Sequence, residues 1–356
     1  MDTLAVIILC ISIFPTLASL IKWDDWWIRI FDFPRVQIAV IQIIILFIAI
    51  WLIPYFSLTY IVLFAVAVLS FLYQLVKIFP YTNLARQQVL RYKGNEKSNN
   101  VSILVSNVLE TNRDASKLLS LINQYKPDIL LTLESDDWWE AKLSSIEKDY
   151  PYTVKKPLKN LYGIHLYSKL ELIDTEIKYV VDDEIPSIHG YVKLRSGRKV
   201  KIHCLHPTPP SPTERETSTD RDAELLIVGK NVDAKKEPTL VFGDLNDVAW
   251  SRTTRLFQQL SGLLDPRIGR GFYSTFHADY RLLRWPLDHI FLSPEFKLIE
   301  IRRLPHIGSD HFPFFAHLHL VGQSDNLEEA PEVLEEEEEE WVEKKIKKAE
   351  PLQYHL

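Results

Sequence analysis

The chain has 356 residues, a length that allows one large domain with accessory segments or two ordinary domains. Its net charge of −6 is unevenly distributed, because residues 1–100 hold 8 basic and 5 acidic side chains, residues 101–320 hold 29 and 30, and residues 321–356 hold 4 and 12. A protein that grips duplex DNA through many phosphates would show a basic domain or a basic stripe, so the nearly neutral middle region argues against that class.

Three apolar runs open the chain, and each approaches the roughly 20 residues that cross a bilayer. They are Leu4–Leu20, Ile38–Ile53 and Leu58–Val76, and none contains a charged residue. Buried core helices are one alternative. A cleaved signal peptide is another for the first run, although its Met-Asp-Thr start lacks the positive charge that such peptides carry. Residues 1–80 therefore predict a membrane anchor with three transmembrane helices.

The polar segments beside these runs predict an orientation. Trp23, Trp26 and Trp27 are typical of an aromatic belt at the membrane interface. Basic residues gather in the first connection and after the third run, at Lys22, Arg29, Arg35, Lys77, Arg86, Arg91, Lys93 and Lys97. With three crossings, both basic segments lie on one side, and the positive-inside rule makes that side the cytoplasm. The chain is then a multi-pass protein of the cell membrane with the lipid bilayer as partner; an extracytoplasmic catalytic domain is the alternative.

Residues 81–100 are polar and predict a linker, and residues 101–320 predict a β-rich soluble domain. Short runs rich in Val, Ile and Phe predict strands at Val101–Ser106, Asp128–Leu133, Lys199–Leu205, Thr239–Phe242, Asp288–Leu292 and Phe312–Leu320. Helices are expected around Ser116–Tyr125 and Asp222–Val232, which gives an α+β domain with packed sheets. Cys10 and Cys204 are far apart and indicate neither a disulfide framework nor a zinc site.

The acidic low-complexity tail, residues 321–356, contains Glu335–Glu340 followed by four lysines. Opposite charges at helical spacing predict a solvated, partly helical extension. A metal-collecting or partner-binding role for the glutamates is the alternative.

Polar residues recur where the predicted strands stop. Strand ends on a rigid sheet can direct side chains from distant positions to one point, which is how catalytic residues are often held. The residues expected to converge are Asn107, Glu134, His206, Asp244, Asn246, Asp288, Asp310 and His311.

At these positions the sequence resembles the endonuclease/exonuclease/phosphatase (DNase I-like) superfamily. The segments SNVLE at Asn107, LES at Glu134, LHP at His206, GDLN at Asp244, LDHIF at Asp288 and SDH at Asp310 stand in the order that this superfamily shows. Each string is weak alone, and six in order are specific. The resemblance covers the soluble domain and implies a four-layer α/β/β/α sandwich. The apolar spans, the WWIRIFDFPR loop and the GRGFYSTFH stretch suggest its membrane-anchored branch.

The resemblance implies a metal-dependent hydrolase of phosphoester bonds. Phosphodiesters are negatively charged, so the site needs a cation at the phosphoryl oxygens and a base for water. Glu134, Asp310 and Asn107 are the expected ligands of Mg²⁺, with Mn²⁺ possible, because hard oxygen donors suit these ions. A solvated turn is the alternative reading of a lone Glu after a strand.

The catalytic roles also follow the resemblance. His311 is the expected general base, or stabilises the transition state as imidazolium, and Asp288 orients its ring. Asp244 and Asn246 are expected to bind the phosphate or the attacking water, and His206 to protonate the leaving oxygen. A capped turn is the alternative for His311, and ordinary turn formation is the alternative for GDLN.

One position departs from the apurinic endonuclease branch, where an acidic residue stands two places after the motif Asn. Here that place is Leu109, with Glu110 next, which argues against a second metal ligand from this loop and against abasic-site repair. Four arginines before Asp288 offer a possible phosphate clamp, with surface solvation as the alternative: Arg267, Arg270, Arg281 and Arg284. The expected substrate is a nucleic acid or a lipid-linked phosphate, and the competing function is a catalytically inactive membrane receptor or scaffold.

Overall fold

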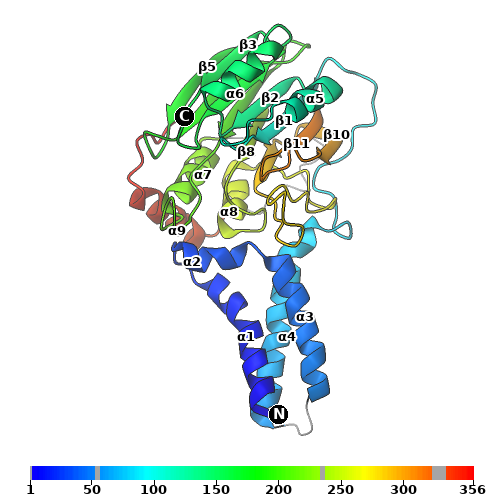
Figure 1. Cartoon of the computed structure of the whole chain (residues 1–356), viewed down its shortest axis with the longest axis vertical. Coiled ribbons are helices and arrows are strands. Elements are labelled where there is room, and N and C mark those ends of the chain that lie inside the picture. The colour runs from blue at the N-terminus through cyan, green and yellow to red at the C-terminus, as the bar shows by residue number, and fades with distance from the viewer. Residues whose placement is uncertain (1, 53–56, 233–236, 323–333) are drawn as a thin grey trace.

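The computed structural model describes residues 2–52, 57–232, 237–322 and 334–356. A sandwich of sheets and helices stands on a bundle of apolar helices (Figure 1). The helices are α1 Asp2–Leu20, α2 Trp26–Arg29, α3 Arg35–Leu52, α4 Leu58–Ile78, α5 Ser116–Tyr125, α6 Asp137–Leu143, α7 Thr219–Asn231, α8 Arg252–Ser261 and α9 Glu336–Lys348, with short 3-10 turns η1 Ile30–Asp32, η2 Phe79–Tyr81 and η3 Ser144–Ile146. The strands are β1 Asn100–Asn107, β2 Ile129–Leu133, β3 Tyr152–Lys156, β4 Ile164–Ser168, β5 Glu171–Tyr179, β6 Pro186–Lys193, β7 Lys199–Leu205, β8 Thr239–Asp244, β9 Asp288–Leu292, β10 Phe296–Arg303 and β11 Phe314–Leu320.

The strands form two sheets with related topologies. The first has the order β10-β11-β1-β2-β4-β3, and the second has the order β5-β6-β7-β8-β9. Each contains one parallel pair, β1 with β2 and β7 with β8, flanked by antiparallel neighbours. Parallel neighbours end at the same edge of a sheet, so each sheet brings two strand ends together.

Alternation of side chains along the strands produces three apolar layers. Ile103 and Leu131 of the first sheet pack against Ile202 of the second. On the outer faces, Leu104 meets α5 and α6, and Val241 meets α7 and α8. The order is therefore helix, sheet, sheet, helix, and the predicted α/β/β/α sandwich is confirmed.

The N-terminal helices α1, α3 and α4 form a bundle that projects from one end of the sandwich (Figure 1). Thr3–Leu20 and Leu58–Tyr81 are long and apolar enough to cross a membrane. A third crossing is counted if Trp26–Asp32 and Arg35–Trp51, which are bent by 72°, form one span. The first and third predicted spans are thus candidate membrane helices. The second counts as a span only if the two helices of the bent pair are taken as one crossing. The predicted turn at Pro54, and Ile53 before it, lie outside the described residues.

Polar side chains join the bundle helices internally. Gln42 Nε2 donates to Ser12 O at 2.9 Å and to Ser70 Oγ at 2.8 Å, and Gln74 Nε2 donates to Thr16 Oγ1 at 2.7 Å. Such hydrogen bonds, with apolar side chains facing outward, are typical of helix association in a bilayer.

The segment predicted as a linker packs along the sandwich. Val89 is fully buried in the core between the sheets, and Tyr92 N donates to Leu298 O of β10 at 2.9 Å. The few apolar residues of this polar run follow no helix or strand period, which is why the sequence indicated only a connection.

The tail is helical as predicted, but it is not solvated throughout. Within α9, Val342 and Ile346 are buried against α7 and α8, and Glu338 pairs with Arg255 of α8, whereas most of the other glutamates face solvent. Residues 323–333 of the predicted tail lie outside the described residues. The C-terminal helix is therefore part of the packed structure.

Candidate functional site

The two parallel strand pairs bring their carboxyl ends to one place. Asn107 ends β1 and Asp244 ends β8, while Glu134 and His206 follow β2 and β7 directly. Gly243 permits this approach, because a Cβ added there would lie 1.9 Å from Leu205 O of the neighbouring strand. Its φ of +150° also favours glycine.

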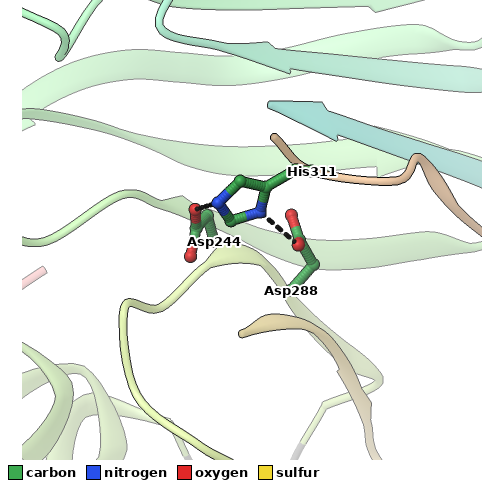
Figure 2. A group of neighbouring side chains, drawn as sticks. All are labelled: Asp244, Asp288 and His311. Carbon is green, nitrogen blue, oxygen red and sulfur yellow. Dashed lines mark hydrogen bonds and ion pairs between the residues drawn. The ribbon is translucent and has the colours of Figure 1, made fainter. Parts of the chain in front are cut away.

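His311 lies between two buried carboxylates (Figure 2). Its Nδ1 is 2.8 Å from Asp288 Oδ2, and its Nε2 is 3.4 Å from Asp244 Oδ2. Asp288 starts β9 directly opposite Asp244 in the ladder, and His311 comes just before β11. The ligand atoms of these three residues all lie within 4.8 Å of one another.

Asn107 connects this group to Glu134. Its Nδ2 donates to Glu134 Oε1 at 2.8 Å and to Asp244 Oδ2 at 3.2 Å, while its Oδ1 accepts from Leu109 N at 3.0 Å. In this arrangement Asn107 bridges two carboxylates through its amide nitrogen. Presenting its oxygen to a cation, as the sequence predicts, requires the amide to turn over.

Burial and crowded charge perturb the acid–base groups. Burial raises the pKa of Glu134 to about 7, against the lowering effect of the hydrogen bond from Asn107. Burial likewise raises the pKa of Asp244. Burial alone would lower the pKa of His311, but the carboxylates of Asp244 and Asp288 outweigh it and raise that pKa to about 10. Perturbed groups that share a cavity mark a candidate active site.

The donor set suits a hard divalent cation. Glu134, Asp244 and Asp310 line the same cavity as His311, together with His206 and Glu214. Asp288 Oδ1 is buried without a hydrogen-bond partner among the described residues. Among the described residues, no Lys or Arg in the cavity lining balances these carboxylates. Mg²⁺ or Mn²⁺ would neutralise their negative charge, because both ions prefer oxygen ligands.

Asn246 and His206 complete the predicted set. Asn246 adopts φ +50°, donates from Nδ2 to Pro207 O at 2.9 Å, and its carbonyl accepts from Arg221 Nη1 at 2.7 Å. His206 is buried beneath the ring of Tyr162, with 5.2 Å between ring centroids, and burial lowers its pKa to about 4. Both residues line the cavity with His311.

The cavity of about 740 Å³ also contains residues that the motif analysis missed. Tyr162 donates its hydroxyl to Glu214, and Phe276 packs on His311 with ring centroids 4.9 Å apart. Further lining comes from the N-terminal segment and from loops, at Trp26, Ile30, Phe33, Pro34, Pro209, Pro210, Pro212, Leu161, Leu283, Trp285 and Leu287. The WWIRIFDFPR and GRGFYSTFH segments supply several of these residues. The sequence singles out both segments but does not predict that they line the cavity.

The predicted arginine clamp is not found in the cavity lining. Arg267 is fully buried, pairs with Asp265 at 2.7 Å and donates to Asp288 O at 3.2 Å, so it supports β9 instead. Arg270 binds the carbonyl of Val89 and thereby fixes the N-terminal segment. Arg284 donates to Ala278 O at 2.7 Å within its own loop. Arg281 is exposed, as the solvation alternative expects.

Two kinds of comparison bear on this geometry. The model of the Endonuclease/Exonuclease/phosphatase family matches residues 104–311, which is more than half of the chain and spans every predicted site residue. The chain belongs to the endonuclease/exonuclease/phosphatase family. A comparison with curated protein sequences gives no significant match.

Solved structures share the fold of this family member. An endonuclease/exonuclease/phosphatase from Beutenbergia cavernae DSM 12333 matches with a TM-score of 0.52 and 17% identity, over 63% of this chain and 72% of that one. D. rerio TDP2 humanized by 14 mutations matches with a TM-score of 0.51 and 17% identity, over 62% and 100%. D. rerio TDP2 complexed with a single strand DNA product matches with a TM-score of 0.51 and 16% identity, over 62% and 99%. At these identities the likeness supports the fold of the sandwich.

Proposed function

We propose that this chain is a membrane-anchored, divalent-cation-dependent phosphoesterase that hydrolyses phosphodiester, phosphomonoester or pyrophosphate bonds at the bilayer surface. The observation that carries the proposal is the convergence of His311, Asp244 and Glu134 in one cavity, with Asp288 holding the His311 ring from behind. Hydrolysis of a phosphoester needs positive charge at the phosphoryl oxygens and groups that move protons to and from water. The carboxylates would hold a cation, and the raised pKa of His311 favours the imidazolium, whose Nε2–H can donate to a phosphoryl oxygen.

Each residue has a role that follows from its position. Glu134 and Asp310, with the oxygen of Asn107 once its amide is turned, would hold Mg²⁺ or Mn²⁺. The cation supplies charge neutralisation at the phosphate. Asp288 holds the His311 ring through Nδ1, so Nε2 is the atom that exchanges a proton with water or donates to a phosphoryl oxygen.

The remaining predicted residues surround the substrate position. Asp244, which faces Nε2 of His311, would position the attacking water, and Asn246 would contact a phosphoryl oxygen. Burial lowers the pKa of His206, so its ring is neutral at physiological pH. A neutral ring has one N–H, and that N–H would donate to the leaving oxygen.

The test is a substrate panel of lipid phosphates, single-stranded oligonucleotides and nucleoside diphosphates, with Mg²⁺, Mn²⁺ or EDTA. The nucleotide arm is included because the D. rerio TDP2 structure was solved with a single strand DNA product. We expect His311→Ala and Glu134→Gln to lower kcat by roughly 100-fold or more, while Glu176→Gln, on an exposed side chain of β5, leaves it unchanged. Equal activity in the parent and His311→Ala would remove this mechanism, and a parent that hydrolyses nothing on the panel would favour an inactive receptor or scaffold.

The orientation is a separate prediction of the same proposal. The positive-inside rule, applied to Lys22, Arg29 and Arg35 beside the first span, places the sandwich in the cytoplasm. A green fluorescent protein fused after Leu356 is expected to fluoresce, and alkaline phosphatase at the same point is expected to be inactive. Active alkaline phosphatase with a dark fluorescent fusion would place the site outside the membrane instead.

A further inference from the structure

One wall of the catalytic cavity is built by the membrane anchor. Trp26, Ile30, Phe33 and Pro34 line the same space as His311. This segment is fixed on the sandwich, because Trp26 N donates to Glu216 O at 2.9 Å and Trp250 Nε1 donates to Asp32 O at 2.8 Å. A cavity of about 740 Å³ is within the range that holds small organic molecules.

A continuous row of aromatic rings leads from the anchor to the reactive imidazole. Phe33 lies 6.0 Å from Trp285, Trp285 lies 5.9 Å from Phe276, and Phe276 lies 4.9 Å from His311, all between ring centroids. Such a row provides apolar contact along its whole length. The reactive group therefore stands at the polar end of an otherwise apolar path.

The other end of this path lies next to the candidate membrane helices. Ile30 is 51% exposed and Leu283 is 50% exposed although both line the cavity, and Trp27 beside them is exposed too. The loop that carries Leu283 is held against α3, because Gln37 Nε2 donates to Leu282 O at 2.8 Å. Exposed apolar and Trp side chains next to membrane helices are typical of the interfacial region.

The charge of the cavity separates the candidate substrates. Its ionisable lining consists of Glu134, Glu214, Asp244, Asp310 and histidines, and no Lys or Arg belongs to it in the described part of the chain. A nucleic acid strand presents several phosphates in a row and is normally held by a positive groove. A single phosphate group with a divalent cation fits this lining, whereas a row of phosphates would meet acidic and apolar walls.

We propose that the cavity accepts a phosphate ester of a membrane lipid, with the phosphate at His311 and the hydrocarbon chain along the row Phe276, Trp285 and Phe33. This inference rests on the proposed phosphoesterase function and specifies its substrate class. The anchor then acts as part of the substrate site as well as a tether, because its residues contact the chain of the lipid.

The experiment compares two substrates with one leaving group on the full chain in phosphatidylcholine nanodiscs with Mg²⁺. Methyl and dodecyl 4-nitrophenyl phosphate both release 4-nitrophenolate and differ only in the chain. We expect kcat/KM for the dodecyl ester to exceed that for the methyl ester at least about tenfold, since each buried methylene favours binding. A single-stranded oligonucleotide is assayed beside them.

Partitioning into the bilayer would also favour the dodecyl ester, so a pair of matched variants isolates the cavity. Leu283→Ser is expected to lower the dodecyl-to-methyl ratio several-fold. Leu352→Ser, an equally exposed leucine in the C-terminal segment, is expected to leave the ratio unchanged. Because both leucines are about half exposed, neither change removes a core side chain.

The outcomes separate the two proposals. Three outcomes would overturn the lipid inference and leave the phosphoesterase proposal standing. They are turnover of both esters with a ratio near one, a ratio that Leu283→Ser does not alter, and preferred cleavage of the oligonucleotide. If nothing on the panel is hydrolysed, binding of dodecyl and methyl phosphate is measured by calorimetry on the parent and on Leu283→Ser. Tighter binding of dodecyl phosphate that Leu283→Ser abolishes would then support the ligand class while the hydrolase proposal fails. Equal binding of both phosphates would overturn the lipid inference as well.

Discussion

His311 depends on a carboxylate that does not itself line the cavity. Asp288 is fully buried, and its Oδ2 fixes Nδ1 of the imidazole at 2.8 Å. In Asp288→Asn the amide can offer an N–H where the carboxylate accepted one, which turns the ring or changes its tautomer. In the proposed mechanism Asp288 is therefore a positioning residue, and its effect would reach the substrate through His311.

We expect Asp288→Asn to lower kcat by roughly 100- to 10,000-fold while KM changes less than about threefold, because orientation of the ring matters most in the transition state. Steady-state kinetics on any substrate from the panel measures both constants. Asp137→Asn, at a carboxylate 67% exposed on α6, is the matched control. A large rise in KM with normal kcat would show that Asp288 serves substrate binding instead.

Much of the candidate site could be predicted from the sequence because strand ends are easy to recognise. Glu134, His206, Asp244 and His311 line one cavity, since parallel pairing carries the ends of β1, β2, β7 and β8 to one edge. Tyr162 and Phe276 could not be predicted in this way. They come from loops, where no periodic pattern indicates which side chain points inward.

At the scale of elements, α9 is held by a buried ion pair. Lys345 contacts Asp24 in the loop between α1 and α2 and lies 3.0 Å from Asp222 of α7, and its side chain is only 3% exposed. The pKa of Asp24 is lowered: burial alone would raise it, but Lys345 outweighs that effect. The C-terminal helix, the anchor and the sandwich thus meet at one lysine.

Lys345→Met is expected to lower the free energy of unfolding by about 1.5–3 kcal/mol, because it removes a buried positive charge from between two buried carboxylates, which keep only Lys348 and Arg221 as partners. Lys344→Met is the control, since Lys344 is 76% exposed and its pair with exposed Glu340 is worth less than about 0.5 kcal/mol. Urea unfolding in dodecyl maltoside measures both variants. Equal stability of the two variants would mean that α9 docks through Val342 and Ile346 alone.

The sequence predicted α9 only in part. Alternating blocks of Glu and Lys indicated a helix, but its apolar stripe consists of Val342 and Ile346 at a spacing of four, too short a pattern to predict docking. The packing of the segment around Val89 against the sandwich could not be predicted for the same reason. Elements with one or two buried residues depend on contacts that only the assembled fold provides.

At the scale of the whole molecule, the largest difference between sequence and structure concerns the anchor. The tryptophans near α2 were predicted as an interfacial belt, yet Trp26 and Phe33 also line the catalytic cavity. A pattern within one segment can indicate a membrane interface. It cannot indicate which surface of a domain more than 70 residues further along the chain will pack against that segment.

The core of the second sheet makes the whole fold sensitive to acid. His189 Nδ1 lies 2.6 Å from His203 Nδ1, and His189 Nε2 lies 2.8 Å from Ser187 Oγ, all fully inside the protein. Burial lowers the pKa of His189 to about 3 and that of His203 well below its usual value, and the positive charges of Lys178 and Lys201 act in the same direction. Both rings are therefore neutral in the folded protein.

A lowered pKa means that the unfolded chain binds protons more tightly than the folded one. The stability from the neutral His189–His203 pair is fully present above the unfolded pKa of about 6.5, and below it each ring costs about 1.4 kcal/mol per pH unit. We expect the urea midpoint of the sandwich to fall steeply between about pH 6.5 and 4, and His189→Phe to reduce that slope whatever its effect on absolute stability. His355→Phe, at an exposed histidine, should keep the parent slope. An unchanged slope in His189→Phe would locate the acid sensitivity in other groups, because the substitution removes a ring that only the unfolded chain protonates in this pH range.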